Sequence, residues 1–231
     1  MINLMYIVLT AMLALNVSSD VLDGFVQVED GLARTNASVG RRNDAIYRQL
    51  ESFTEQNPGK GTPWLEKASD VRARARSLYE YVDSLKLAIV READGEDGDP
   101  AAINRRDDLE SAAIVMLSAG NGQGARLRGR IDAYRDYVTA LVPDSTKRAS
   151  IEEALSTAPF RRPGTVTPLP WEEAKFENQP VVASVTLLTK LQNDIRYAEG
   201  EALANLLAAV DAGDVRVNEL NAFVIPQSRM V

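Results

Sequence analysis

The sequence predicts an all-α protein, in which a single N-terminal transmembrane helix continues into a helical bundle, with the first strand of a following β domain at the C-terminus. Residues 1–19 contain no charged side chain and are mostly apolar. Apolar residues then recur at helical spacing through most of residues 20–213, whereas residues 214–231 follow a strand-like pattern. We therefore expect a transmembrane helix at 1–19, a helical bundle at 20–213 and the start of a truncated β-rich domain at 214–231.

Composition excludes several classes of function. The 231 residues include no Cys and no His, so they cannot form the usual zinc sites, use thiol chemistry or supply an imidazole base. The formal net charge of −7, with basic residues scattered along the chain, argues against binding to nucleic acid. The loops GNGQG and DGEDGD match neither a nucleotide-binding motif nor an EF-hand. We therefore predict no enzyme activity, no metal site and no cofactor.

The first helix has three uncharged polar side chains on one face. As a helix, residues 1–19 would span about 28 Å, close to the hydrocarbon thickness of a bilayer. At helical spacing, Asn3, Tyr6 and Thr10 point in similar directions. Polar side chains in a membrane helix turn toward protein or water, so these three should face a partner subunit, either as simple helix–helix contacts or beside a proton path. Because the segment has no carboxylate, any proton-binding acid would belong to the partner.

The charges that flank this segment indicate how it is used. No Lys or Arg precedes the apolar run, which is unlike a cleaved signal peptide and favours a retained membrane anchor. Acidic residues follow it at Asp20, Asp23, Glu29 and Asp30, and the first basic residue is Arg34. The scarcity of Lys and Arg on that side favours a cytoplasmic N-terminus and a body on the other side of the membrane.

A heptad series extends the first helix beyond the apolar run. Apolar residues seven apart predict one helix from about residue 2 to 55; they are Phe25, Leu32, Val39, Ile46 and Phe53. This seam can pack against the chain's own bundle, or its lower part can pair with a second copy. In the second case the dimer seam consists of Leu22, Phe25, Leu32 and Val39. Asn36 and Asn43, beside the seam, would then fix the register, as buried asparagines do in coiled coils.

Spacing and capping predict five further helices. Their expected ranges are 62–91, 101–118, 125–142, a short helix around 151–155, and 178–212. Thr62 and Pro63 are typical of a helix start. Residues 157–180 contain five of the ten prolines, which predicts an irregular crossing. The expected core residues are Phe53, Val71, Leu78, Leu85, Ile131, Val138, Leu188 and Ile195.

The C-terminal pattern differs in kind from the rest of the chain. The stretch VRVNELNAFVIPQSRMV first alternates and then becomes β-branched and aromatic, which is typical of a strand. A single strand has no neighbour with which to pair its backbone, so we expect a β-rich domain to follow it.

Three blocks of sequence resemble one known family. MINLMYIVLTAMLALNVSSDVLDGFV at residues 1–26 is similar to the N-terminus of the gliding-motility protein M family (GldM/PorM) of the type IX secretion system. WEEAKFENQPVVASVTLLTKLQNDIRYAE at residues 171–199 resembles the family's second signature, and VNELNAFVIPQSRMV resembles the start of its β-rich domain. Residues 57–160 match the family only in helical character.

The resemblance implies a single-pass inner-membrane subunit with a cytoplasmic N-terminus and a periplasmic body. It further implies a homodimer surrounded by a ring of L-type membrane subunits, five around two. Proton flow through the ring would turn the dimer and power secretion and gliding through periplasmic and outer-membrane components. Asn3, Tyr6 and Thr10 would then face the partner's carboxylate. The alternatives are a passive scaffold that spans the periplasm and a membrane-anchored helical sensor.

Overall fold

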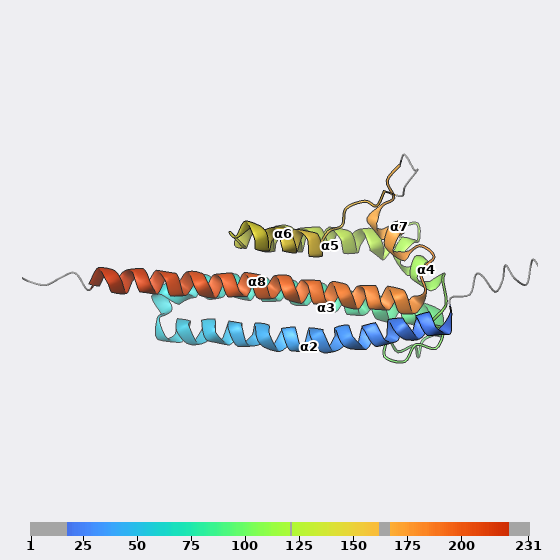
Figure 1. Ribbon diagram of the computed structural model, residues 1–231, viewed down its shortest axis with the longest axis horizontal. Helices are drawn as coiled ribbons and strands as arrows, with labels where there is room; N and C mark the ends of the chain where they lie inside the picture. The colour runs from blue at the N-terminus through green and yellow to red at the C-terminus, as the bar shows by residue number, and fades with distance from the viewer. Residues whose placement is uncertain (1–17, 121, 162–166, 222–231) are drawn as a thin grey trace, which may run out of the picture.

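The computed structural model describes residues 18–120, 122–161 and 167–221 (Figure 1). These ranges contain seven helices and no β-strand, which confirms the predicted all-α class. The helices are α2 (Ser19–Gln56), α3 (Pro58–Asp94), α4 (Ser111–Leu117), α5 (Gln123–Leu141), α6 (Ser145–Ala154), α7 (Trp171–Phe176) and α8 (Val181–Asn221).

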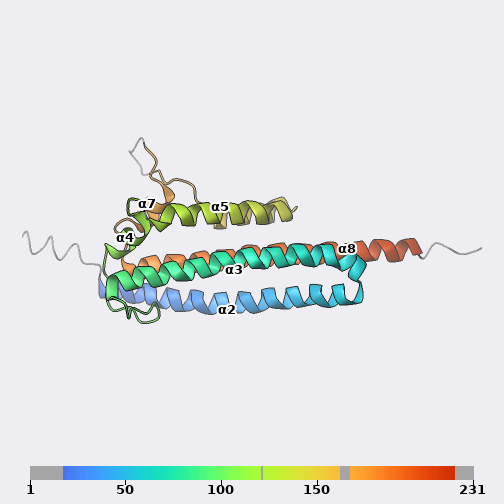
Figure 2. The same ribbon diagram turned by 180° about the vertical axis from the view of Figure 1, so that it is seen from behind.

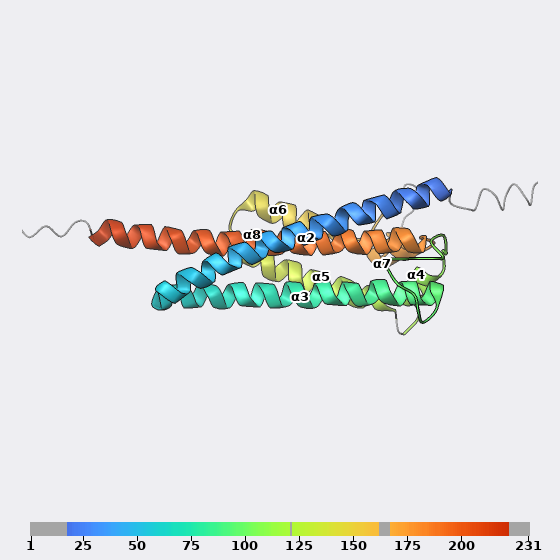
Figure 3. The ribbon, with the colours of Figure 1, turned by 90° about the horizontal axis from the view of Figure 1, so that it is seen from below.

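The long helices α2, α3 and α8 form a three-helix group. α2 and α8 run parallel and side by side, whereas α3 returns antiparallel to both (Figures 1 and 3). α5 packs on the other side of α3 and α8 (Figure 2), and α6 folds back along α5 (Figure 1). Because α2, α3, α5 and α6 all contact α8, this helix lies at the centre of the bundle.

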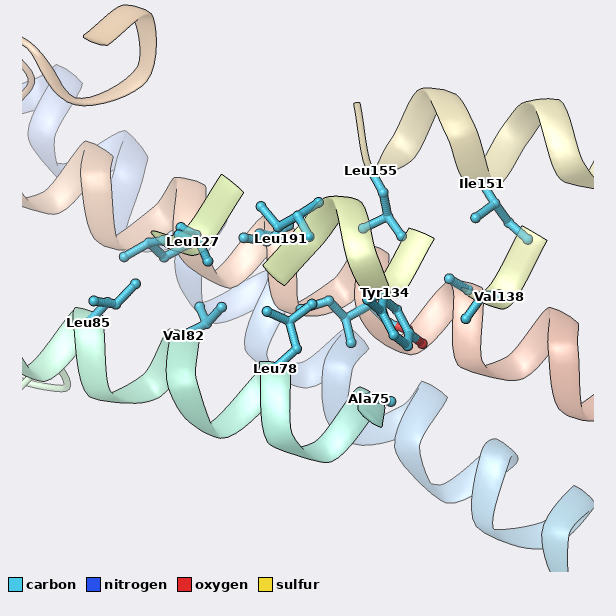
Figure 4. Packing of buried hydrophobic residues seen from close by; sticks show 14 of the residues in the cluster. Ala75, Leu78, Val82, Leu85, Leu127, Tyr134, Val138, Ile151, Leu155 and Leu191 are labelled. Atoms are coloured by element: carbon cyan, nitrogen blue, oxygen red, sulfur yellow. The ribbon is translucent and has the colours of Figure 1, made fainter. Parts of the chain in front are cut away.

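The core lies between α3, α5 and α8. Figure 4 shows Leu78, Val82 and Leu85 of α3 pointing toward Leu127 and Tyr134 of α5. The predicted core is confirmed at the buried residues Val71, Leu78, Leu85, Ile131, Val138, Leu188 and Ile195, and Phe53 is partly buried against them. Heptad spacing therefore identified the inward faces correctly.

The turn between α2 and α3 is tighter than the sequence suggested. α3 begins at Pro58 rather than at the expected residue 62. Proline is well suited to this first turn, because the N–H group that it lacks would have no partner within the helix there. Thr62 does not cap the helix, and its hydroxyl donates to the carbonyl of Pro58 within the first turn at 2.7 Å. A Cβ at Gly61 would lie 2.7 Å from the Cα of Thr54, so only glycine allows the two helices to approach this closely.

The structure differs from the prediction in two further segments, and hydrogen bonds define both of them. The expected helix at 101–118 forms only as α4, because the Asp108 carboxylate accepts the backbone N–H groups of Glu110 and Ser111, both at 2.9 Å, and starts the helix there. The irregular crossing at 157–180 contains the unpredicted helix α7 and an isolated antiparallel bridge between Phe160 and Leu169.

The C-terminal strand prediction is wrong for residues 214–221. These residues continue α8, whose backbone groups pair within the helix and need no neighbouring strand. Residues 222–231, the rest of the predicted β-rich start, lie outside the described residues.

The structure also contradicts the predicted location as a single-pass inner-membrane protein with a cytoplasmic N-terminus and a periplasmic body. Within residues 18–120, 122–161 and 167–221, no helix is both long and apolar enough to cross a bilayer. Charged residues interrupt each of the long helices at short intervals; α8, for example, contains Lys190, Asp194 and Arg196. Residues 1–17, including Asn3, Tyr6 and Thr10, lie outside the described residues.

Candidate functional site

Two asparagines of α2 fix its register against α8. Asn36 Nδ2 donates to the carbonyl of Thr189 at 3.2 Å, and Asn43 Nδ2 donates to the carbonyl of Arg196 at 2.8 Å. Both asparagines are buried, and donors and acceptors are each seven residues apart, so one contact repeats the other a heptad later. A shift of either helix by less than a heptad would remove both bonds and leave buried polar groups without partners.

A buried carboxylate lies beside the second asparagine. Glu199 of α8 is 1% exposed and accepts from Asn43 Nδ2 and from Arg196 Nη1, each at 3.0 Å. Arg72 of α3 approaches the same carboxylate at 3.9 Å and also pairs with Asp44 of α2. This Glu199 cluster (Asn43, Asp44, Arg72, Arg196 and Glu199) therefore joins all three long helices.

A second polar group lies about one heptad closer to the start of α8. Lys86 Nζ of α3 donates to Thr189 Oγ1 at 2.9 Å and to Gln192 Oε1 at 3.2 Å, and it lies 3.7 Å from Glu29 of α2. Thr189 Oγ1 in turn donates to Glu29 Oε1, and Gln192 Nε2 donates to Asp83 Oδ1. This Lys86 cluster (Glu29, Asp83, Lys86, Thr189 and Gln192) again connects α2, α3 and α8.

Close packing holds α8 on two sides. A Cβ at Gly200 would lie 2.6 Å from Asn43 Oδ1, so glycine allows α2 to approach α8 at the Glu199 cluster. On the opposite side, the buried Tyr134 hydroxyl of α5 donates to the carbonyl of Ile195 at 3.1 Å. Burial raises the pKa of Tyr134 well above its ordinary value, so this phenol stays neutral and keeps its proton for the bond.

The residues that precede α8 determine where this helix begins. Trp171 and Phe176 of α7 are buried and meet edge to face, with ring centroids 6.0 Å apart. Asn178 then adopts a left-handed conformation, with φ 53°, at the sharp turn into α8. The N–H groups of Val181 and Val182, which have no partner within the helix, donate to carbonyls of the 101–110 loop.

The two polar clusters line a groove between α2 and α3. Two adjoining crevices, of about 320 and 790 Å³, share Gly40, Asp44, Tyr79 and Arg196. Asp44 and Glu199 are paired with cations, and within the described residues no group of three acidic side chains could hold a metal. The two clusters therefore resist sliding of α2 and α3 along α8.

The predicted dimer seam lies partly covered within one chain. Leu22, Phe25, Leu32 and Val39 are half-buried, and the Thr186 hydroxyl of α8 donates to the carbonyl of Phe25 at 3.3 Å. Packing against the chain's own bundle is therefore observed, and pairing of this seam with a second copy stays a prediction. Sequence reasoning missed the polar face of α8, whose signal was a polar residue every three or four positions at Thr186, Thr189, Gln192, Arg196 and Glu199.

A comparison with known protein families matches most of the described chain. The family model of the GldM N-terminal domain matches residues 20–209. This range begins with α2 and includes nearly all of the three-helix group and both polar clusters. No curated protein matches the chain.

Proposed function

The chain belongs to the GldM family and to the machinery of gliding motility and type IX secretion, and from this premise we propose that it transmits movement within that machinery. In this role the three-helix group of α2, α3 and α8 acts as a stiff strut. Force enters at one end of the group and leaves at the other without the helices sliding past one another.

The observation that supports this proposal most strongly is the pairing of α2 with α8. The two helices run parallel, and the asparagine contacts lock them at two points one heptad apart. The Lys86 and Glu199 clusters tie α3 to the same two points. To slide under load, the strut would have to break several buried polar bonds together, each of which is costly to leave unmade.

The proposed drive and partners follow the family resemblance. Two copies of the chain would form a homodimer, and a ring of L-type subunits, five around two, would turn the dimer with energy from the proton gradient. Secretion components of the outer membrane would receive the movement. We assign the chain no catalytic activity and no cofactor in this scheme.

A disulfide across the α2–α8 contact tests whether the strut works as one rigid body. Because the native chain has no cysteine, Asn43→Cys with Gly200→Cys creates a single possible pair at the closest approach of the two helices. Because Asn36 still bonds to the carbonyl of Thr189 in this variant, we expect secretion and gliding to proceed equally well after oxidation and after reduction of the cysteine pair. The matched control is the Asn43→Cys single variant under the same conditions and at equal protein abundance, because a side chain at Gly200 fits only once the Asn43 amide is removed.

The opposite result would be informative as well. If oxidation stopped secretion in the double variant alone, and reduction restored it, then α2 and α8 would have to move against each other during work. That outcome would contradict the rigid strut.

A further inference from the structure

One face of α2 is covered by no other described part of the chain. Val21 and Val28 are 50% and 53% exposed, although both are apolar. A Cβ at Gly24 or Gly31 would meet nothing within 4 Å outside the helix itself. With the exposed Thr35 and Ser38, these residues repeat at alternating steps of three and four. We name them the outer face: Val21, Gly24, Val28, Gly31, Thr35 and Ser38.

This spacing is that of the a and d positions of a coiled-coil heptad. In the same frame, the e positions hold Phe25, Leu32 and Val39, which are half-buried in the chain's own bundle. The g positions lie along the opposite edge of the helix: after Asp20 and Gln27 they hold Arg34, Arg41 and Arg48, and the last two follow the outer face toward the C-terminal end of α2.

The three g-position arginines have no partner within the described residues. All three are exposed, and among residues 18–120, 122–161 and 167–210 none of them takes part in a hydrogen bond, ion pair or ring contact. Some other exposed arginines of the bundle do find partners: Arg76 pairs with Glu80, and Arg130 stacks on Tyr81. A line of uncompensated positive charge about 21 Å long therefore starts at the edge of the outer face and continues beyond it along α2.

We propose that the outer face docks a helix of another protein that presents Asp or Glu at its e positions. In a parallel coiled coil, g residues of one helix pair with e residues of the next, so acidic e positions would meet Arg34, Arg41 and Arg48. The exposed valines supply apolar contact, and Gly24 and Gly31 let the partner's backbone come close. This inference goes beyond the proposed function and does not depend on it.

Charge complementarity argues against a second copy of α2 as the occupant. In a parallel pair of α2 helices, each g position faces the e position five residues later, so Arg34 would face the apolar Val39 and Arg41 the apolar Ile46, and neither would meet an opposite charge. In an antiparallel pair, g positions face g positions, so arginine would oppose arginine. The proposed homodimer seam also uses the other edge of the helix, so the two surfaces are different.

The experiment uses the 231-residue chain and a fluorescein-labelled helical peptide with Leu at a, Ala at d and Glu at e. Fluorescence anisotropy measures binding. The triple variant Arg34→Glu, Arg41→Glu and Arg48→Glu should bind this peptide at least about tenfold more weakly, because three attractive pairs become repulsive. A matched peptide with Lys at e should show the reverse preference, binding the triple variant better than the native chain.

The control variant changes the net charge equally at exposed arginines on other helices, Arg91→Glu, Arg126→Glu and Arg148→Glu. Circular dichroism checks that both variants remain helical. Three results would each overturn the proposal: no binding of the acidic peptide to the native chain, an equal loss in the control variant, or equal binding of the acidic and basic peptides. Disulfide formation between two copies of a Val28→Cys chain would assign the outer face to a second copy and would overturn it too.

Discussion

Replacement of Leu188 by Ala should lower the free energy of unfolding by about 2–5 kcal/mol. Leu188 is 1% exposed on the central helix α8, so its truncation removes fully buried apolar atoms. The side chain also borders an existing cavity of about 400 Å³ between α6, α7 and α8. The neighbouring groups are therefore poorly placed to close over the lost volume, and we expect the upper part of the range. Urea denaturation followed by circular dichroism measures the change.

The matched control for Leu188 is a truncation of an apolar side chain on the surface. Ile114 of α4 is 46% exposed, and Ile114→Ala should cost less than about 1 kcal/mol. Equal losses for the two variants would mean that α8 is not the centre of the packed core.

Replacement of Arg196 by Met should cost about 3 kcal/mol. The change removes the guanidinium that donates to Glu199 at 3.0 Å but keeps most of the apolar stem. Glu199 then stays buried with Asn43 at 3.0 Å, and the nearest remaining cation is the guanidinium of Arg72 at 3.9 Å. The cost comes from the uncompensated carboxylate rather than from lost packing. Chemical denaturation at neutral pH provides the measurement.

A second substitution separates these two explanations for Arg196. Glu199→Gln in the Arg196→Met background removes the buried charge while keeping the shape and one amide acceptor. We expect it to restore most of the lost stability, since a buried ion pair can often be replaced by neutral groups of similar volume. If the double variant were no more stable than Arg196→Met, the charge of Glu199 would not be the source of the cost.

Much of the fold could be predicted because its helices are long and periodic. Heptads of apolar residues identified α3 and α5 and the core residues Leu78, Ile131 and Leu188. The segments that resisted prediction depend on contacts between distant residues. The 101–110 loop stays non-helical because the Asp108 carboxylate starts α4 later and the loop carbonyls bond the first N–H groups of α8. At the C-terminus, the local strand pattern of 214–221 did not prevent α8 from continuing.

The candidate site could be predicted in part. Sequence spacing suggested that Asn36 and Asn43 fix a helical register in a pairing with a second copy, and in the structure they fix one against α8 of the same chain. The polar face of α8 could not be recognised as an interface, because its meaning depends on which helices pack there. From the sequence alone, Glu199 would be expected at the surface, as most glutamates are. In the structure it is buried and accepts hydrogen bonds from Asn43 and Arg196.

The central claim is that the chain moves when the machinery works. The most direct measurement is polarised fluorescence from a dye on a sole cysteine at Ser77→Cys, an exposed position on α3, in cells that secrete and glide. We predict that the polarisation varies with time while the proton gradient is maintained and becomes constant when an uncoupler collapses it. A constant polarisation under an intact gradient, with secretion still running, would contradict transmission of movement and would leave the passive scaffold as the better description.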